Sequence, residues 1–133
     1  MPFSPGVTAM SVEGVWQGLK VFEKADVDPV TLQIATMKGI KRTVRTFGKV
    51  LGHRAGLAGA RLLPYAEARR EIYVPTYSWV LEHKLAAEIA ALRKLGEGGK
   101  TVLLLDYETN CDVTDLSRPL SHASLVARFV DGA

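Results

Sequence analysis

Three polar residues near the start of the chain have types and a spacing that suit chemistry. Glu13, Gln17 and Lys20 lie at i, i+4 and i+7, so a helix places them on one face. A carboxylate, an amide and an ammonium on one face can hold a polar ligand, with Glu13 placed to act on a proton or a water. Every amphipathic helix also needs a solvated polar face, so the pattern alone leaves both interpretations open.

A second candidate is the acidic segment 106–115, which follows the apolar run 102–105. Its four acids include Asp112 and Asp115. Ligand groups often follow a buried strand, but Asp and Asn are also ordinary turn formers. The segment is therefore either part of a ligand-binding site or a loop whose Asp and Asn residues form its turns. Downstream, Arg118 and His122 suit a phosphate contact or a titrating group, or a structural role at a helix start.

Length and composition bound the class of protein. The chain has 133 residues, of which 47% are apolar and 23% charged, as expected for one globular domain. No apolar run approaches the roughly 20 residues that a membrane span needs, and no secretory signal is visible, so we expect a cytoplasmic protein. One cysteine and three scattered histidines predict no internal disulfide and no structural zinc site. We expect no metal and no cofactor. Cys111 has no neighbouring histidine to activate it as a nucleophile.

The charges are unevenly distributed along the chain. Residues 29–66 contain no acid but seven cations: Lys38, Lys41, Arg42, Arg45, Lys49, Arg54 and Arg61. This asymmetry favours an anionic partner, either a phosphate-bearing molecule or nucleic acid. A solvated basic face without a partner is the alternative.

The helices and strands that must position these residues are predicted from the spacing of apolar residues and from the caps, glycines and prolines that end each element. Residues 11–22 predict a helix with Ser11 as N-cap and an apolar stripe of Val12, Val15, Trp16, Leu19 and Phe22. Further helices are expected over residues 29–37, about 43–50, 64–73, 76–95 and about 119–130. Pro75 should separate two of them, and residues 102–105 read as a buried strand. The predicted fold class is α+β, a helix-rich single domain over residues 1–133 with a small sheet.

Three stretches, taken in order, resemble the NADAR family. Residues 11–22 are similar to its "(T/S)-x-E-H-x-x-Q-x-x-K" helix, and residues 48–54 to its "A-K-x-L-G-R" segment. Residues 62–73 resemble "R-x-D-W-x-x-x-R-x-x-V-M", with Tyr65 at the Trp position and Arg69 close to the Arg. Two departures are visible. Gly14 stands where the family has His, and its C-terminal "D-x-x-W-G…G-x-N-x-L-G" pattern is missing.

The resemblance implies a metal-independent N-glycosidase that acts on an ADP-ribose-related or ribosylated-base substrate. Its partner would be a small nucleotide-like molecule or ADP-ribosylated nucleic acid. Glu13 is then the catalytic carboxylate. The substrate-binding residues implied are Gln17, Lys20, Lys49, Arg54, Arg69, Asp112 and Asp115. Cleavage of a ribosyl N-glycosidic bond develops positive charge at the sugar carbon, which a carboxylate stabilises, and a pyrophosphate needs cations.

Two other functions stay open. The missing C-terminal pattern also suits a module that binds ADP-ribose or a nucleotide without catalysis. The acid-free segment suits a basic protein that binds nucleic acid through phosphates.

Overall fold

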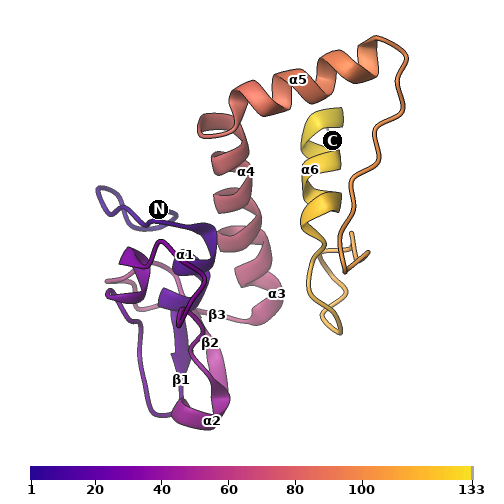
Figure 1. The fold of residues 1–133 in the computed structure, drawn as a ribbon. Coiled ribbons are helices and arrows are strands. Elements are labelled where there is room, and N and C mark those ends of the chain that lie inside the picture. Colours follow the sequence, from indigo (N-terminus) through magenta and orange to yellow (C-terminus); the bar gives the residue numbers. More distant parts are fainter. Residues whose placement is uncertain (133) are drawn as a thin grey trace. The chain divides into compact units, whose positions relative to one another are not determined.

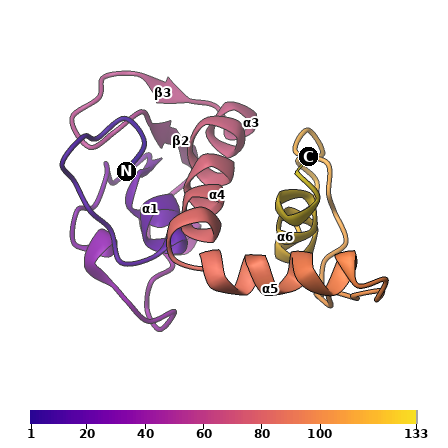
Figure 2. The same cartoon turned by 90° about the horizontal axis from the view of Figure 1, so that it is seen from above.

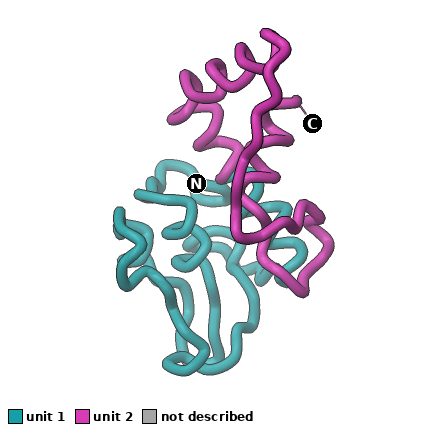
Figure 3. Tube along the Cα trace, turned by 45° about the vertical axis from the view of Figure 1, so that its right-hand side comes forward, with its two compact units in different colours: residues 1–76 teal, residues 77–133 magenta. Residues whose placement is uncertain are grey.

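A computed structural model describes residues 1–132. The chain forms two compact units, Met1–Thr76 and Tyr77–Ala133 (Figure 3). The predicted α+β class is confirmed, because the helices are accompanied by a small three-stranded antiparallel sheet. The sequence predicted one domain for the whole chain, and each unit has its own set of elements.

The first unit holds the whole sheet, in the order β1-β2-β3. Its elements are α1 (Val12–Gly18), β1 (Lys20–Phe22), the 3-10 turn η1 (Thr31–Gln33), α2 (Val44–Phe47), β2 (Val50–Arg54), β3 (Leu62–Leu63), α3 (Tyr65–Ala68) and the π-helix η2 (Arg69–Tyr73). Figure 1 shows β1 and β2 side by side, with α2 at the end of their ladder. In the ladder Lys20 lies opposite His53, and His53 lies opposite Leu63.

Helix α1 begins as predicted but ends earlier. Ser11 is its N-cap, and the Ser11 Oγ accepts a hydrogen bond from the Gly14 backbone N–H at 2.9 Å. The predicted continuation to Phe22 is wrong, because the helix stops at Gly18 and the chain turns into β1. A Cβ at Gly18 would lie 2.7 Å from the Leu32 side chain, so this end of the helix is packed too closely for a larger residue. Residues 20–22 continue the helical spacing of apolar residues, but they pair with β2 as a strand instead.

The rest of the first unit departs from prediction at its glycines and prolines. The expected helix over residues 29–37 is only the turn η1, although Asp28 accepts the Val30 backbone N–H as a cap should. Strand β2 occupies residues where a loop was expected after a short helix. Pro75 does not interrupt the helix, because the wide turn of η2 directly before α4 (Val74–His83) carries the helical path past it.

The core of the first unit packs α1 against β3, α3 and η2. Its buried cluster consists of Val15, Leu19, Leu63, Ala68 and Ile72. Apolar burial of this kind stabilises by about 1.5–3 kcal/mol for each large side chain. It therefore fixes α1, the element that carries Glu13 and Gln17, against β3, α3 and η2.

The second unit is helical. Helix α4 leads into α5 (Ala86–Glu97), and α6 (His122–Asp131) follows a long loop. The predicted single helix over residues 76–95 is thus broken near Leu85. Helices α5 and α6 cross rather than run parallel (Figure 2), and Arg93 joins them by donating to the carbonyls of Phe129 and Val130, both at 3.0 Å.

The predicted buried strand over residues 102–105 is wrong. These residues are extended, exposed and unpaired, with Leu103 82% and Leu105 92% exposed. The described part of the protein offers this apolar run no neighbouring strand, and no helix buries it fully. In residues 1–132 no helix is both long and apolar enough to cross a membrane.

Candidate functional site

One hydrogen-bonded chain links the three polar residues predicted from the N-terminal pattern. Gln17 is 5% exposed, and its Nε2 donates to Glu13 Oε1 at 2.8 Å. The Gln17 Oε1 accepts from Lys20 Nζ at 3.2 Å and from the Arg42 backbone N–H at 3.2 Å. Lys20 comes from β1 rather than from the helix, yet its ammonium reaches the same amide. Gln17 therefore orients both the carboxylate and the ammonium.

Arg42 supports this cluster at the C-terminal end of α1. Its Nη1 donates to the carbonyls of Gln17 at 3.1 Å and Lys20 at 2.6 Å, and its Nη2 to the Asp26 carbonyl at 2.5 Å. Its guanidinium lies 5.0 Å from the Phe22 ring. Arg42 thus ties the last turn of α1 to β1 and to the following turn. Sequence reasoning had counted it only as one member of a basic segment.

Replacing Arg42 by alanine should lower the free energy of unfolding by about 2 kcal/mol, because carbonyls at the end of α1 lose a charged donor. Arg42→Lys should recover only part of this, since an ammonium cannot span three carbonyls. Arg45→Ala is the matched control, because Arg45 is exposed on α2. Urea titration measures all three, and equal stabilities for the two alanine variants would contradict the assignment.

A pocket of about 320 Å³ lies beside the polar chain. Its lining residues are Lys20, Val50, Leu51, Gly52, His53 and Tyr65. Burial lowers the pKa of Lys20; Glu13 opposes this, and the nearby Arg42 and Lys41 lower it further. The pocket thus presents an ammonium that is partly stripped of water, next to two ring systems.

His53 is the residue that sequence reasoning missed. It is 1% exposed on β2, and its ring stacks on Trp16 with centroids 3.7 Å apart. Neither ring nitrogen has a hydrogen-bond partner among the described residues. The pKa of His53 is lowered to about 3, mainly by burial. The positive charge of Lys20 also lowers this pKa, whereas the adjacent backbone of Trp16 raises it. His53 is therefore a neutral imidazole at the pocket wall, with one donor and one acceptor to offer.

Aromatic rings extend this wall. Tyr65 meets Trp16 edge-on at 5.7 Å between centroids, and Tyr73 does so at 5.4 Å. Arg69, predicted to bind substrate, donates from Nη2 to the Tyr65 hydroxyl at 3.1 Å and lies 4.8 Å from its ring. Arg69 thus contacts a residue that lines the pocket.

Two other predicted cations, Lys49 and Arg54, do not line this pocket. Arg54 forms a two-pronged ion pair with Asp26, with Nε and Nη2 each 2.9 Å from a carboxylate oxygen. These bonds hold the pKa of Asp26 below its usual value. Lys49 is exposed. Arg61 is also paired, with Glu71 at 2.7 Å, so the basic segment is partly structural.

Asp112 and Asp115 belong to the second unit, where each organises its own turn. Asp112 Oδ1 accepts the Thr114 backbone N–H at 2.8 Å, and Asp115 Oδ1 accepts that of Ser117 at 3.0 Å. Hydrogen bonds from these turns lower the pKa of both carboxyls. These contacts are those of turn-forming residues.

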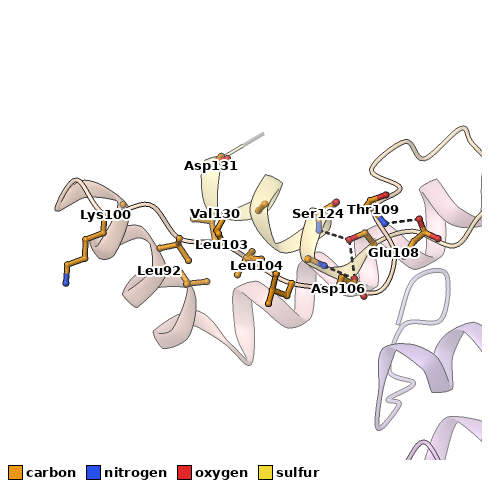
Figure 4. A pocket seen from close by; sticks show the side chains of 16 residues that line it. Leu92, Lys100, Leu103, Leu104, Asp106, Glu108, Thr109, Ser124, Val130 and Asp131 are labelled. Atoms are coloured by element: carbon orange, nitrogen blue, oxygen red, sulfur yellow. Dashed lines mark hydrogen bonds between the residues drawn. The ribbon is translucent and has the colours of Figure 1, made fainter.

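The second unit has a larger pocket of about 560 Å³ (Figure 4). Its walls are mainly apolar and come from α5, α6 and the extended residues 102–105, with Asp106 and Glu108 at one end. Asp106 Oδ2 accepts from the Ala123 backbone N–H and the Ser121 hydroxyl, both at 3.2 Å. Its carboxylate therefore caps α6.

The chain belongs to a family of unknown function, DUF6939, whose family model matches residues 1–126. No curated protein and no solved structure matches it. The NADAR assignment is therefore wrong, because the family model that matches nearly the whole chain is a different one. The physical basis of the likeness is limited: the shared residues build α1, β2 and α3, whereas the C-terminal pattern is absent.

Proposed function

We propose that this member of a family of unknown function binds a ribosylated base or mononucleotide in the pocket beside Lys20 and hydrolyses its N-glycosidic bond. The observation that carries the proposal is the hydrogen-bonded chain from Glu13 through Gln17 to Lys20, which ends at a pocket walled by His53 and Tyr65. A carboxylate, an ammonium, a neutral imidazole and an aromatic ring then lie within one part of the first unit.

Each wall of the pocket matches one part of such a ligand. The Lys20 ammonium suits a phosphate, and the unpartnered nitrogens of His53 suit ribose hydroxyls. The Tyr65 ring offers a face for a base. A volume of about 320 Å³ is at the small end of ligand pockets, which span roughly 300–1,000 Å³, and favours a mononucleotide over a whole dinucleotide.

The reaction needs only water and a carboxylate. The C–N bond breaks with its electron pair moving to the base nitrogen, while the water oxygen bonds to the sugar carbon. Glu13 stabilises the positive charge that develops on the sugar and takes the proton from the water, and the leaving base takes up a proton from solvent. Glu13 Oε1 is held by Gln17, which fixes the carboxylate's direction.

Replacing Glu13 by glutamine should reduce hydrolysis by at least about 100-fold, since general base catalysis contributes roughly 10²–10⁴-fold. Base release from nucleoside monophosphates, nicotinamide mononucleotide and ADP-ribosylated guanosine would be followed by chromatography. Glu88→Gln is the control, because Glu88 also stands in the first turn of a helix, α5, but is exposed. A wild-type protein inert on every substrate would reject the hydrolytic function.

A second candidate is a module that binds the same ligand without turnover. It is favoured by the fact that Glu13 is not among the residues that line the pocket. Calorimetry with the same nucleotides separates the two: binding without base release supports the module, and the loss of that binding in Lys20→Met would locate it in this pocket.

A further inference from the structure

Residues 100–106, Lys-Thr-Val-Leu-Leu-Leu-Asp, form an extended segment (Figure 1), in which the Lys100 N–H still donates to the Leu95 carbonyl at 3.2 Å. Every residue in it is exposed. Among the described residues, the backbone N–H and carbonyl groups of residues 101–105 form no hydrogen bond. An extended run of apolar residues with unpaired backbone groups is a template for strand pairing.

The two faces of this segment differ as they do in a strand. Val102 and Leu104 are 39% and 38% exposed, whereas Leu103 and Leu105 are 82% and 92% exposed. The four apolar residues 102–105 all line the pocket of the second unit with Leu92 and Val130 (Figure 4), but Val102 and Leu104 are the two that are more covered. One face is thus half covered by the unit's own helices, and the other face and the backbone edge are uncovered.

We propose that this edge pairs with the same segment of a second copy of the chain, as two antiparallel strands related by a two-fold axis at Leu103. In this register Leu103 lies opposite Leu103 of the partner subunit, and Val102 opposite Leu104 of the partner subunit. The same register places Lys100 opposite Asp106 of the partner subunit. The two-fold axis repeats each of these pairs, so the contact closes as a dimer.

Charge complementarity selects this occupant and this register. The segment has one cation at its start and one anion at its end, equally distant from Leu103. Only the antiparallel arrangement centred there joins both charges, twice, across the ladder. A register centred on Val102 places Lys100 opposite Leu104, and one centred on Leu104 leaves Asp106 opposite Val102. A parallel arrangement would set Lys100 beside itself, which is repulsive.

Sedimentation velocity of the full chain over a range of concentrations tests the dimer. The wild type should form dimers, and Leu103→Pro or Leu104→Pro should weaken dimerisation at least about tenfold. Both positions are tested because only every second residue of an antiparallel strand donates its N–H to the neighbouring strand. Either Leu103 or Leu104 is therefore such a donor, and one of the two substitutions removes it. Leu103→Thr keeps the donor and the strand preference and should stay dimeric.

Leu103→Pro and Leu104→Pro should leave the fold intact, because the N–H groups that they remove make no hydrogen bond within residues 1–132. Circular dichroism checks this. A wild type that is monomeric at every concentration overturns the proposal. A dimer that survives both prolines overturns it too, because its interface then lies elsewhere.

The register is tested by charge. Lys100→Glu sets two carboxylates against each other at both ends of the ladder and should weaken the dimer, by less at high salt. Lys94→Glu, on the exposed face of α5, changes the net charge equally and should have no effect. Asp106 is left unchanged because it caps α6. Equal dimerisation of the two variants would reject this register.

Discussion

Acidification should destabilise the first unit far more in the wild type than in a His53→Phe variant. The pKa of His53 is about 3 in the folded chain, against 6.5 for an ordinary histidine. The folded state therefore excludes a proton that the unfolded chain binds. Stability from this group is fully present above pH 6.5 and is lost as the pH falls towards about 3. The loss grows by about 1.4 kcal/mol per pH unit and totals about 5 kcal/mol.

The measurement is urea unfolding from about pH 7 to about pH 4, followed by tryptophan fluorescence. A Trp79→Phe background leaves Trp16, which stacks on His53, as the reporter of the first unit. Phenylalanine keeps a ring against Trp16 but cannot be protonated. His83→Gln is the control, because His83 is exposed on α4. Parallel pH profiles for wild type and His53→Phe would show that the imidazole is not buried as a neutral group.

Local rules predicted the part of the site that local structure builds. The Ser11 cap and the i, i+4 spacing of Glu13 and Gln17 follow from helix geometry, and both are present. The position of Lys20 was predicted on wrong grounds. It was placed one helical turn further along, but it reaches Gln17 from a strand, because the chain reverses after Gly18.

The rest of the site depends on contacts between distant residues, which periodicity does not encode. His53 pairs across the sheet with Lys20 and stacks on Trp16, so its burial follows from the register of β1 with β2. Arg42 binds carbonyls more than 20 residues away, at Gln17 and Lys20. A count of charges cannot separate such an arginine from a solvated one.

The predictions for Pro75 and for residues 102–105 were wrong because each used a local rule that omits the neighbouring structure. Proline removes a backbone donor, but the π-helix directly before α4 lets the helical path continue through Pro75. The run 102–105 has the composition of a buried strand, but composition says nothing about a partner strand. An apolar extended run without a partner strand among the described residues is instead a candidate for pairing between chains.

Gly52→Ala should cost about 4 kcal/mol of stability, because its backbone and its surroundings both exclude a side chain. Its φ is +152°, and a Cβ built there would lie 2.5 Å from the Leu63 carbonyl oxygen and 3.0 Å from the Leu62 Cγ. The backbone oxygen cannot move without opening the ladder in which His53 faces Leu63. Since Gly52 also lines the pocket, nucleotide binding should be lost together with stability.

The matched control is Gly96→Ala, within α5, where a Cβ meets nothing within 4 Å. Alanine there should stabilise by about 0.5–1 kcal/mol through its better helix propensity. Thermal unfolding compares the two variants, and calorimetry with a mononucleotide tests binding. If Gly52→Ala changed stability by less than about 0.5 kcal/mol, as an ordinary surface substitution does, β2 and β3 would not approach as closely as the structure shows, and the wall that carries His53 would be misplaced.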